Sequence, residues 1–256
     1  MVKLVRLVIK KRIITISNHK GGVGKTTSVL NIGAGLSRLG KRVLLIDIDP
    51  QSNLTMSLGI NNPEYNIYGA ISGDYPLKPI EVTKKLDIIP SVLGLLGADI
   101  ELSNEYKNRF ILKELLKPLL GKYDYIIIDS PPSLGLLTIN ALTASEEVYI
   151  TLQPHFFALQ GLSKLTEIIE EVKNNLNPGL KIGGVIITLW DSRKVLHRDV
   201  TETVIEHFKK VVSNTKIREN IALAEAPAQG LDIYRYQPNS KGAEDYTNLC
   251  KEIIKR

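Results

Sequence analysis

The 256-residue chain is predicted to be an α/β protein with a doubly wound, mostly parallel twisted sheet and helices on both faces. Three observations predict this class. Short β-branched runs alternate with longer segments of helical periodicity. The strongest run, residues 125–128, is apolar throughout, which is typical of a central strand covered on both faces. A glycine-rich turn at residues 20–24 also joins the first predicted strand to the first predicted helix.

The predicted elements alternate along the whole chain. Strands are expected at residues 13–17, 43–47, 86–90, 125–129, 147–152 and 182–189. Helices are expected at residues 26–39, 110–120, 134–144, 160–175, 198–212 and 243–255. Stop signals mark two helix ends, Gly40 after the first helix and Asn177-Pro178-Gly179 after the fourth. Residues 61–79, rich in Gly, Pro, Asn and Tyr, are expected to form a surface excursion.

Positive charge is concentrated at the start of the chain. The formal net charge is +6, and residues 1–12 contribute five cations and no acidic residue, so the remainder is nearly neutral. We therefore predict a basic N-terminal extension at residues 1–12 and a single domain at residues 13–256. The extension is interpreted as a frayed or edge-strand segment, with contact to nucleic acid or another acidic surface as the alternative.

Composition also restricts the cellular setting. Cys250 is the one cysteine, which excludes an intramolecular disulfide and fits a reducing cytosol. Residues 1–12 lack the continuous apolar segment of a secretory signal. No segment approaches about 18 consecutive apolar residues, so no transmembrane span is expected. The sequence thus predicts a cytoplasmic protein.

Residues 20–27 read Lys-Gly-Gly-Val-Gly-Lys-Thr-Thr, the composition of a phosphate-binding loop. Glycines let the backbone curl around an anion, a lysine reaches the β- and γ-phosphates, and a hydroxyl residue holds Mg²⁺. The last two threonines open the first helix, whose unpaired amides would face the phosphates. The predicted nucleotide-binding residues of this loop are Lys20, Gly21, Gly22, Val23, Gly24, Lys25, Thr26 and Thr27.

The loop departs from the usual G-x-x-x-x-G-K-[ST] pattern. Counting back from Gly24 places His19 where the first glycine should stand, and a second lysine, Lys20, follows it. Two lysines from one chain would repel each other on one triphosphate, so Lys20 cannot easily serve the same phosphates from the same side as Lys25.

Two carboxylates follow the second predicted strand. Asp47 and Asp49 are two residues apart, so alternation would point both the same way, off the carboxyl end of that strand. Carboxylates there can bind metal-bound water or orient the attacking water of phosphoryl transfer. We predict a metal-side role for Asp47 and favour Asp49 for the water, with capping of the following turn as the alternative.

The fourth predicted strand ends in Asp129, which Ser130-Pro131-Pro132 follows. An apolar strand ending in Asp is the second metal-side element of P-loop NTPases, where it acts on Mg²⁺ directly or through water. Combined with the phosphate-binding loop, this position predicts Asp129 as a partner of Thr26 at the metal.

These motifs together resemble the deviant P-loop ATPases of the ParA/MinD superfamily, and within it the ParA (Soj-like) DNA-partitioning ATPases. The resemblance spans about residues 12 to 254. The matching segments are residues 20–27, Asp47-Ile-Asp-Pro-Gln-Ser-Asn-Leu-Thr55, Tyr123-Asp-Tyr-Ile-Ile-Ile-Asp-Ser-Pro-Pro132, Leu223-Ala-Glu-Ala-Pro-Ala-Gln-Gly230, and Pro238-Asn-Ser-Lys-Gly-Ala243 running into Tyr246 and Leu249.

The resemblance implies a function for the second lysine. In that family the extra lysine reaches nucleotide bound by the partner subunit, so Lys20 would act in trans and ATP would stabilise a sandwich homodimer. The resemblance also places Pro227, within Glu225-Ala-Pro, in the nucleotide-binding set. One departure is Lys216-Ile217-Arg218-Glu219-Asn220, where the family usually reads Ile-Pro-Arg near the adenine. The sequence therefore assigns no adenine contact there.

The segment from residue 191 to 218 has seven cations and four acidic residues, an excess that by itself is more typical of a solvated helix face. Family members bind DNA without sequence preference through basic residues in this C-terminal part of the dimer, and a ParB-like centromere-binding partner stimulates hydrolysis. The resemblance therefore implies nonspecific double-stranded DNA as a partner and association with the nucleoid. The DNA-binding candidates are Arg193, Lys194, Arg198, Lys210 and Arg218, with Arg235 and Lys241 as secondary candidates.

Two alternative functions are weaker. A MinD-like membrane-cycling ATPase needs an amphipathic tail beyond the last core helix. The helical pattern from Ala243 to Ile254 already belongs to the match with the family's core, and only Lys255 and Arg256 follow it. No membrane partner is therefore expected. A metabolic enzyme on the same scaffold is the second alternative, but an iron–sulfur reductase needs cysteine ligands and Cys250 is alone. The sequence also shows no additional His, Cys or acidic cluster for a second substrate.

Overall fold

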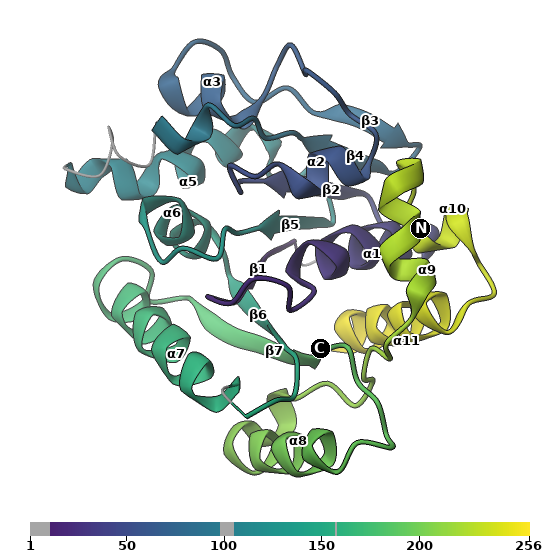
Figure 1. The fold of residues 1–256 in the computed structure, drawn as a ribbon. Helices are drawn as coiled ribbons and strands as arrows, with labels where there is room; N and C mark the ends of the chain where they lie inside the picture. Colours follow the sequence, from purple (N-terminus) through teal and green to yellow (C-terminus); the bar gives the residue numbers. More distant parts are fainter. Residues whose placement is uncertain (1–10, 98–104, 157) are drawn as a thin grey trace, which may run out of the picture.

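A seven-stranded sheet runs through the part of the chain that the computed structural model describes, residues 11–97, 105–156 and 158–256 (Figure 1). The strand order is β3-β4-β2-β5-β1-β6-β7. The strands are β1 (Arg12–Ser17), β2 (Val43–Asp47), β3 (Ile80–Thr83), β4 (Leu86–Ile89), β5 (Tyr125–Asp129), β6 (Glu147–Leu152) and β7 (Lys181–Ile187). Every neighbouring pair is parallel except β3–β4, so the predicted mostly parallel sheet is confirmed.

Helices cover both faces of this sheet. They are α1 (Lys25–Arg38), α2 (Asn53–Ser57), α3 (Ile67–Ser72), α5 (Ile111–Leu116), α6 (Leu136–Ala144), α7 (Ala158–Asn175), α8 (Val195–Phe208), α9 (Ile221–Glu225), α10 (Ile233–Tyr236) and α11 (Lys241–Lys255). In Figure 1, α1, α10 and α11 lie on one side of the central strands, and α3, α5 and α6 lie on the other. Helices α7 and α8 lie along the β6–β7 end of the sheet (Figure 1).

Alternating side chains of the central strands fill two separate cores. In β5, Tyr125 and Ile127 pack with the core on the α1–α11 face, whereas Ile126 and Ile128 pack with the core on the α3–α5–α6 face. A strand that is buried on both faces needs apolar residues at every position, which explains the continuous run at 125–128.

The predicted strands agree closely with the structure. Strands β2, β5 and β6 have the predicted bounds, and β1, β4 and β7 differ by one or two residues at their ends. The edge strand β3 was not predicted. The predicted helix at 110–120 is wrong in part, because α5 ends at Leu116 and a 3₁₀ turn with Pro118 follows. Proline has no backbone N–H to continue the helix. Helix α8 begins three residues before its predicted start and gives way to a 3₁₀ turn at Lys209.

Residues 61–79 are more than the predicted surface excursion. They contain α3, whose start is capped by Asn66, because its Oδ1 accepts a hydrogen bond from the Gly69 amide at 3.2 Å. Ile67 and Ala70 on this helix are buried in the core. The cap and the two apolar residues order a segment whose composition resembles a loop.

The predicted boundary of the basic extension is wrong by one residue, because Arg12 opens β1. Its side chain is only 6% exposed. The guanidinium is paired with Glu147 and donates hydrogen bonds to Tyr149 Oη at 3.1 Å and to the Ile253 carbonyl at 2.5 Å. Arg12 therefore joins the sheet to the end of α11, and residues 1–10 of the predicted extension lie outside the described residues.

Within the described residues, no helix combines the length and the apolar character that crossing a bilayer requires.

Candidate functional site

The phosphate-binding loop lies between β1 and α1, at the carboxyl end of the sheet. Gly22 and Gly24 have φ angles of 73° and 78°, a left-handed conformation that residues with a Cβ rarely adopt. These two glycines curl the loop so that it enters α1 with the first helical amides unpaired within the helix. The sequence prediction of a strand–loop–helix arrangement is confirmed.

An open cavity of about 630 Å³ lies against this loop. It is bounded by the loop, by the segment after β2, by Pro132 after β5 and by the segment that follows α9. The lining residues are Gly21, Gly22, Gly24, Lys25, Thr26, Thr27, Asp49, Gln51, Asn53, Met56, Ser57, Pro132, Leu189, Pro227 and Ala228. The structure thus brings most of the predicted loop residues, Asp49 and Pro227 to one cavity.

The two lysines of the loop have different environments. Lys25 is only 7% exposed, and its Nζ donates a hydrogen bond to the Lys20 carbonyl at 2.8 Å. Burial lowers the pKa of Lys25, although the Asp129 and Asp49 carboxylates oppose this effect. The backbone amide of Lys20 donates to Asn18 Oδ1 at 3.0 Å, and Asn18 itself is bound to the Thr151 carbonyl of β6. The start of the loop is therefore fixed to the sheet.

Thr26 and Asp129 form the predicted pair beside the loop. Thr26 Oγ1 donates a hydrogen bond to Asp129 Oδ2 at 2.7 Å. The other oxygen, Asp129 Oδ1, is buried and has no hydrogen-bond partner. Burial raises the pKa of Asp129, and the neighbouring Asp47 raises it further. A buried carboxylate oxygen without a partner, beside a threonine hydroxyl, suits an oxygen-preferring cation such as Mg²⁺.

Asp47 and Asp49 have different contacts. Asp47 lies opposite Asp129 in the β2–β5 pairing and is fully buried. Its Oδ2 accepts hydrogen bonds from the Thr55 amide at 2.9 Å and the Thr55 hydroxyl at 2.7 Å, and its Oδ1 accepts one from the Asp49 amide at 3.1 Å. Asp49 instead lines the cavity. Because β2 ends at Asp47, the regular alternation of a strand is not maintained as far as Asp49.

Sequence reasoning missed Thr188, which directly follows β7 and supports the loop. Its Oγ1 donates a hydrogen bond to the Val23 carbonyl at 2.9 Å. A Cβ added at Gly24 would lie 3.6 Å from two Thr188 carbons, so the loop passes close to this side chain. A threonine at the end of a predicted parallel strand is a weak signal, because the sequence does not reveal which strand lies beside the loop.

A smaller cavity of about 110 Å³ adjoins the loop at Gly24 and Thr27. It lies between the end of β7, the 217–224 segment and α11. The lining residues are Gly24, Thr27, Thr188, Leu189, Ile217, Arg218, Asn220, Leu223, Ala224 and Tyr246. This is the segment where the sequence departs from the family pattern and where no base contact was assigned.

The predicted DNA-binding residues are mostly engaged within the chain. Arg193 forms a two-point contact with Asp191 at 3.0 and 2.8 Å, and Lys194 lies 3.6 Å from Glu219. Arg198 donates to the Ser192 carbonyl at 3.1 Å.

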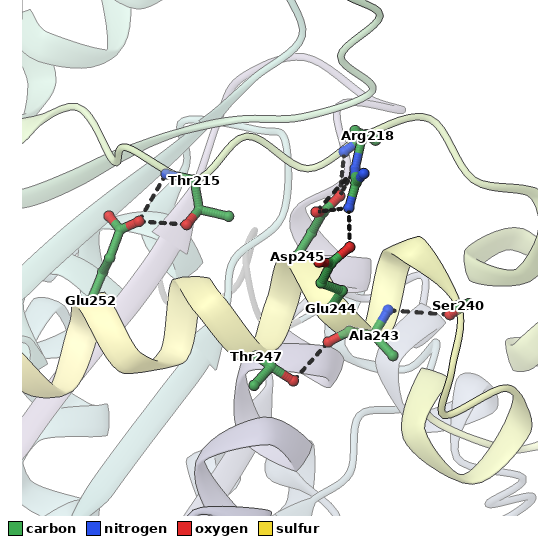
Figure 2. Close-up of polar contacts among 8 residues, drawn as sticks. All are labelled: Thr215, Arg218, Ser240, Ala243, Glu244, Asp245, Thr247 and Glu252. Atoms are coloured by element: carbon green, nitrogen blue, oxygen red, sulfur yellow. Dashed lines mark hydrogen bonds and ion pairs between the residues drawn. The ribbon is translucent and has the colours of Figure 1, made fainter.

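Arg218 is the most strongly engaged of these candidates. Its guanidinium bonds to both Asp245 and Glu244 on α11, at distances down to 2.6 Å (Figure 2). Two carboxylates neutralise this cation, so it is poorly suited to a phosphate contact. Of the secondary candidates, Arg235 is paired with Asp232 at 2.5 Å.

The fold and this constellation define a class of protein, the P-loop nucleotide-binding α/β proteins with a second lysine at the start of the loop. Comparison with known proteins specifies the family. A family model described as an AAA domain matches residues 11–182. The chromosome partitioning protein ParA of Myxococcus xanthus is 46% identical over 251 residues, covering 96% of this chain and 88% of the relative. The sporulation initiation inhibitor protein Soj of Bacillus subtilis is also 46% identical, covering 94% and 98%.

The chain therefore belongs to the ParA/Soj family of partitioning ATPases, as the sequence motifs indicated. Among solved structures, cobyrinic acid a,c-diamide synthase from Mycobacterium smegmatis, with bound ATP analogue and magnesium, is similar with a TM-score of 0.84. It is 33% identical and is covered to 95%, while 96% of this chain is matched. The scaffold is thus common to partitioning proteins and a metabolic enzyme.

Proposed function

We propose that this protein is a Mg²⁺-dependent ATPase of DNA partitioning, which dimerises on ATP, binds DNA nonspecifically as the dimer and releases it after hydrolysis. The observation that carries the proposal is the convergence of Lys25, Thr26 and Asp49 on one cavity, with Asp129 bonded to Thr26 behind it. Family membership supports the partitioning role.

The residues of the loop suit the binding of a nucleoside triphosphate. The amides of the curled loop and of the first turn of α1 would bind phosphate oxygens, and Lys25 would lie against the β- and γ-phosphates. Thr26 and Asp129 would hold Mg²⁺, which supplies positive charge against the phosphates during transfer. The smaller apolar cavity beside Gly24 is the proposed place of the base.

Asp49 is proposed to orient the attacking water. It is 5% exposed and lines the cavity, and its Oδ1 accepts a hydrogen bond from the Gln51 amide at 2.9 Å, which fixes the carboxylate. Asp47 is proposed to act indirectly, because both of its carboxylate oxygens accept hydrogen bonds from Thr55 and the Asp49 amide. Asp47 would then position Asp49 rather than bind the cation directly.

Lys20 is proposed to neutralise charge on nucleotide bound by the partner subunit. The Lys20 carbonyl accepts a hydrogen bond from the Lys25 ammonium, which holds the two residues together within the loop. The two ammonium groups would nevertheless act on different nucleotides, Lys25 on that of its own chain and Lys20 on that of the partner subunit. This division would make ATP the bridge between two subunits. Slow intrinsic hydrolysis and stimulation by a ParB-like partner are proposed to follow, together with a location on the nucleoid in the cytoplasm.

The membrane-cycling alternative finds no support in α11. This helix is amphipathic, but its apolar residues are buried against α1 and α10 rather than exposed. A membrane-binding helix would instead present that face to the bilayer.

A paired binding experiment tests the proposal. We expect a nonspecific duplex to be shifted in gels with ATP and Mg²⁺ and not with ADP, and the shift to weaken steeply with salt. Vesicles of anionic phospholipid should not pellet the protein in either state. DNA binding that is indifferent to nucleotide and salt would favour the metabolic class, and ATP-dependent pelleting would favour the membrane class.

A further inference from the structure

A third pocket, of about 420 Å³, is lined by residues between 205 and 216 and contains a group of lysines. It is bounded by the end of α8, the 3₁₀ turn Lys209–Val211 and the segment after it. The lining residues are Ile205, Lys209, Lys210, Val212, Ser213, Asn214 and Lys216. Three of the seven are lysines and none is acidic.

The three lysines of this pocket differ from several other cations of the C-terminal part, such as Arg193 and Arg218, which are paired with carboxylates. Within the described chain, no ion pair joins Lys209, Lys210 or Lys216 to an acidic side chain, whereas Arg193, Lys194 and Arg218 are all paired. Lysines at the end of a helix do favour its negative dipole end. That effect does not explain Lys216, which lies beyond α8 and the 3₁₀ turn that follows it.

The wall that carries Lys216 is held in place from two sides. Ser213 pairs with β7 through its amide, which donates to the Val185 carbonyl at 2.9 Å. The Glu252 carboxylate of α11 accepts hydrogen bonds from the Thr215 amide at 2.8 Å and from the Thr215 hydroxyl (Figure 2). It also accepts one from the Asn214 amide at 3.0 Å. Glu252 is thus committed to the backbone of the wall.

Two further observations point to a ligand rather than to packing. Ser213 is only 3% exposed, and its hydroxyl has no hydrogen-bond partner. Buried hydroxyls are normally paired, because burial without a partner costs stability. Lys209 has φ 51° and ψ −124°, a backbone conformation that residues with a Cβ rarely adopt. Strain of this kind concentrates at binding sites.

We propose that this lysine pocket, lined by Lys209, Lys210, Lys216 and Ser213, binds a phosphate group of the DNA backbone. The proposal rests on the proposed function. It assigns the DNA contact to these three lysines rather than to Arg193 and Arg218, which are paired with carboxylates. A backbone phosphate carries one negative charge on two non-bridging oxygens, which the ammonium groups can contact. No base edge is read, so binding is independent of sequence.

Trp190 provides a direct optical signal of the pocket. It is the one tryptophan of the chain, and Lys216 Nζ lies 4.5 Å from the centre of its ring. An anion that draws the Lys216 ammonium away from the ring changes the environment of the indole. Fluorescence of Trp190 therefore reports occupancy without requiring DNA binding.

The first experiment titrates inorganic phosphate into protein saturated with ADP and Mg²⁺, so that the nucleotide site is already filled. We expect a saturable change of Trp190 fluorescence that Lys210→Gln weakens and that Lys113→Gln, an exposed lysine on α5, leaves unchanged. A response that is absent, or equal in all three proteins, overturns the pocket.

The second experiment measures duplex DNA binding with ATP across a range of salt. For Lys210→Gln and Lys216→Gln we expect the slope of log affinity against log salt to fall by about one each, with Lys113→Gln unchanged. Normal ATP-dependent DNA binding with an unchanged slope overturns this inference and leaves the proposed function intact. If the wild-type protein fails to bind DNA but phosphate still perturbs Trp190, the proposed function fails and the pocket stands as a site for free phosphate. Vesicle binding that requires Lys210 overturns the assignment to DNA.

Discussion

Two aspartates separated by one residue have different tasks in this site. Asp47 ends β2 and uses both carboxylate oxygens on Thr55 and the Asp49 amide, so it organises the start of α2. Asp49 follows the strand and faces the cavity. Their spacing in the sequence treats the two residues as equivalent, because nothing in the continuation Ile-Asp-Pro shows that β2 ends at Asp47.

Replacing Asp49 by Ala is expected to slow ATP hydrolysis by about 10²-fold or more while ATP binding persists, because the water loses its orienting carboxylate. Single-turnover hydrolysis and size-exclusion chromatography in ATP measure the two effects, and the variant should accumulate as a dimer. Gln51→Ala, which alters another residue of the same cavity, is the matched control. Unchanged turnover in Asp49→Ala would remove this residue from the mechanism.

The buried Asp47–Asp129 pair predicts an unusual pH dependence. Burial raises the pKa of Asp47 from 3.8 to about 7 and raises that of Asp129, so the folded chain without ligand binds protons more tightly than the unfolded chain. The resulting stabilisation is fully present below about pH 4 and is lost as pH rises towards 7; for Asp47 it is at most about 4 kcal/mol.

Urea unfolding at several pH values, in EDTA and without nucleotide, measures this effect. We expect the free energy of unfolding of the wild type relative to Asp129→Asn to fall between pH 4 and 7, because the variant lacks one of the two raised groups. Mg²⁺ with nucleotide should reverse the trend, since a bound cation favours the charged carboxylates. A difference that is constant with pH would contradict the assignment.

At the scale of elements, the sequence predicted the strands and helices that show a clear hydrophobic periodicity. It missed the features that depend on tertiary contacts. The parallel strands were predicted because they are buried on both faces, and their carboxyl ends placed Lys25, Thr26 and Asp129 correctly around one site. The short helices α2, α9 and α10 were missed, because a helix of four or five residues shows no periodicity. The support of the loop by Thr188 required knowledge of which strand lies beside it.

The pairing of Arg218 with α11 is a second feature that no pattern in the sequence reveals. Asp245 is 7% exposed, and it accepts hydrogen bonds from the Arg218 amide at 2.9 Å and from the guanidinium (Figure 2). Asp245→Ala leaves these donors unpaired, and we expect a loss of about 1–3 kcal/mol of stability. The exposed Asp191–Arg193 pair is the natural comparison, because Arg193 is 87% exposed and Arg193→Ala should cost less than about 1 kcal/mol.

Thermal or urea unfolding of the two variants measures the difference directly. The salt dependence of DNA binding should change little in Arg218→Met, because this cation is already neutralised. Equal stability losses in Asp245→Ala and Arg193→Ala would show that the α11 contact is no stronger than a surface pair.

At the scale of the whole molecule, the proposed action of Lys20 on the partner's nucleotide would couple dimerisation to the bound nucleotide. ATP with Mg²⁺ at about 100 times its dissociation constant should stabilise the folded chain by about 2.7 kcal/mol through binding alone. If Lys20 reaches nucleotide in the partner subunit, ATP should add a second increment that grows with protein concentration, because a dimer forms only by mass action. ADP should give the first effect without the second.

Melting temperatures measured over a hundredfold range of protein concentration separate these contributions. We expect the melting temperature in ATP to rise with concentration for Asp49→Ala, in which hydrolysis is blocked, and to be independent of concentration in ADP. Adding Lys20→Ala to that background should abolish the concentration dependence while the stabilisation by bound nucleotide remains, whereas adding Lys164→Ala, an exposed lysine on α7, should preserve both. A Lys20→Ala variant that still shows the concentration dependence would place its charge on the nucleotide of its own chain, since only a contact across the interface ties ATP binding to the meeting of two subunits.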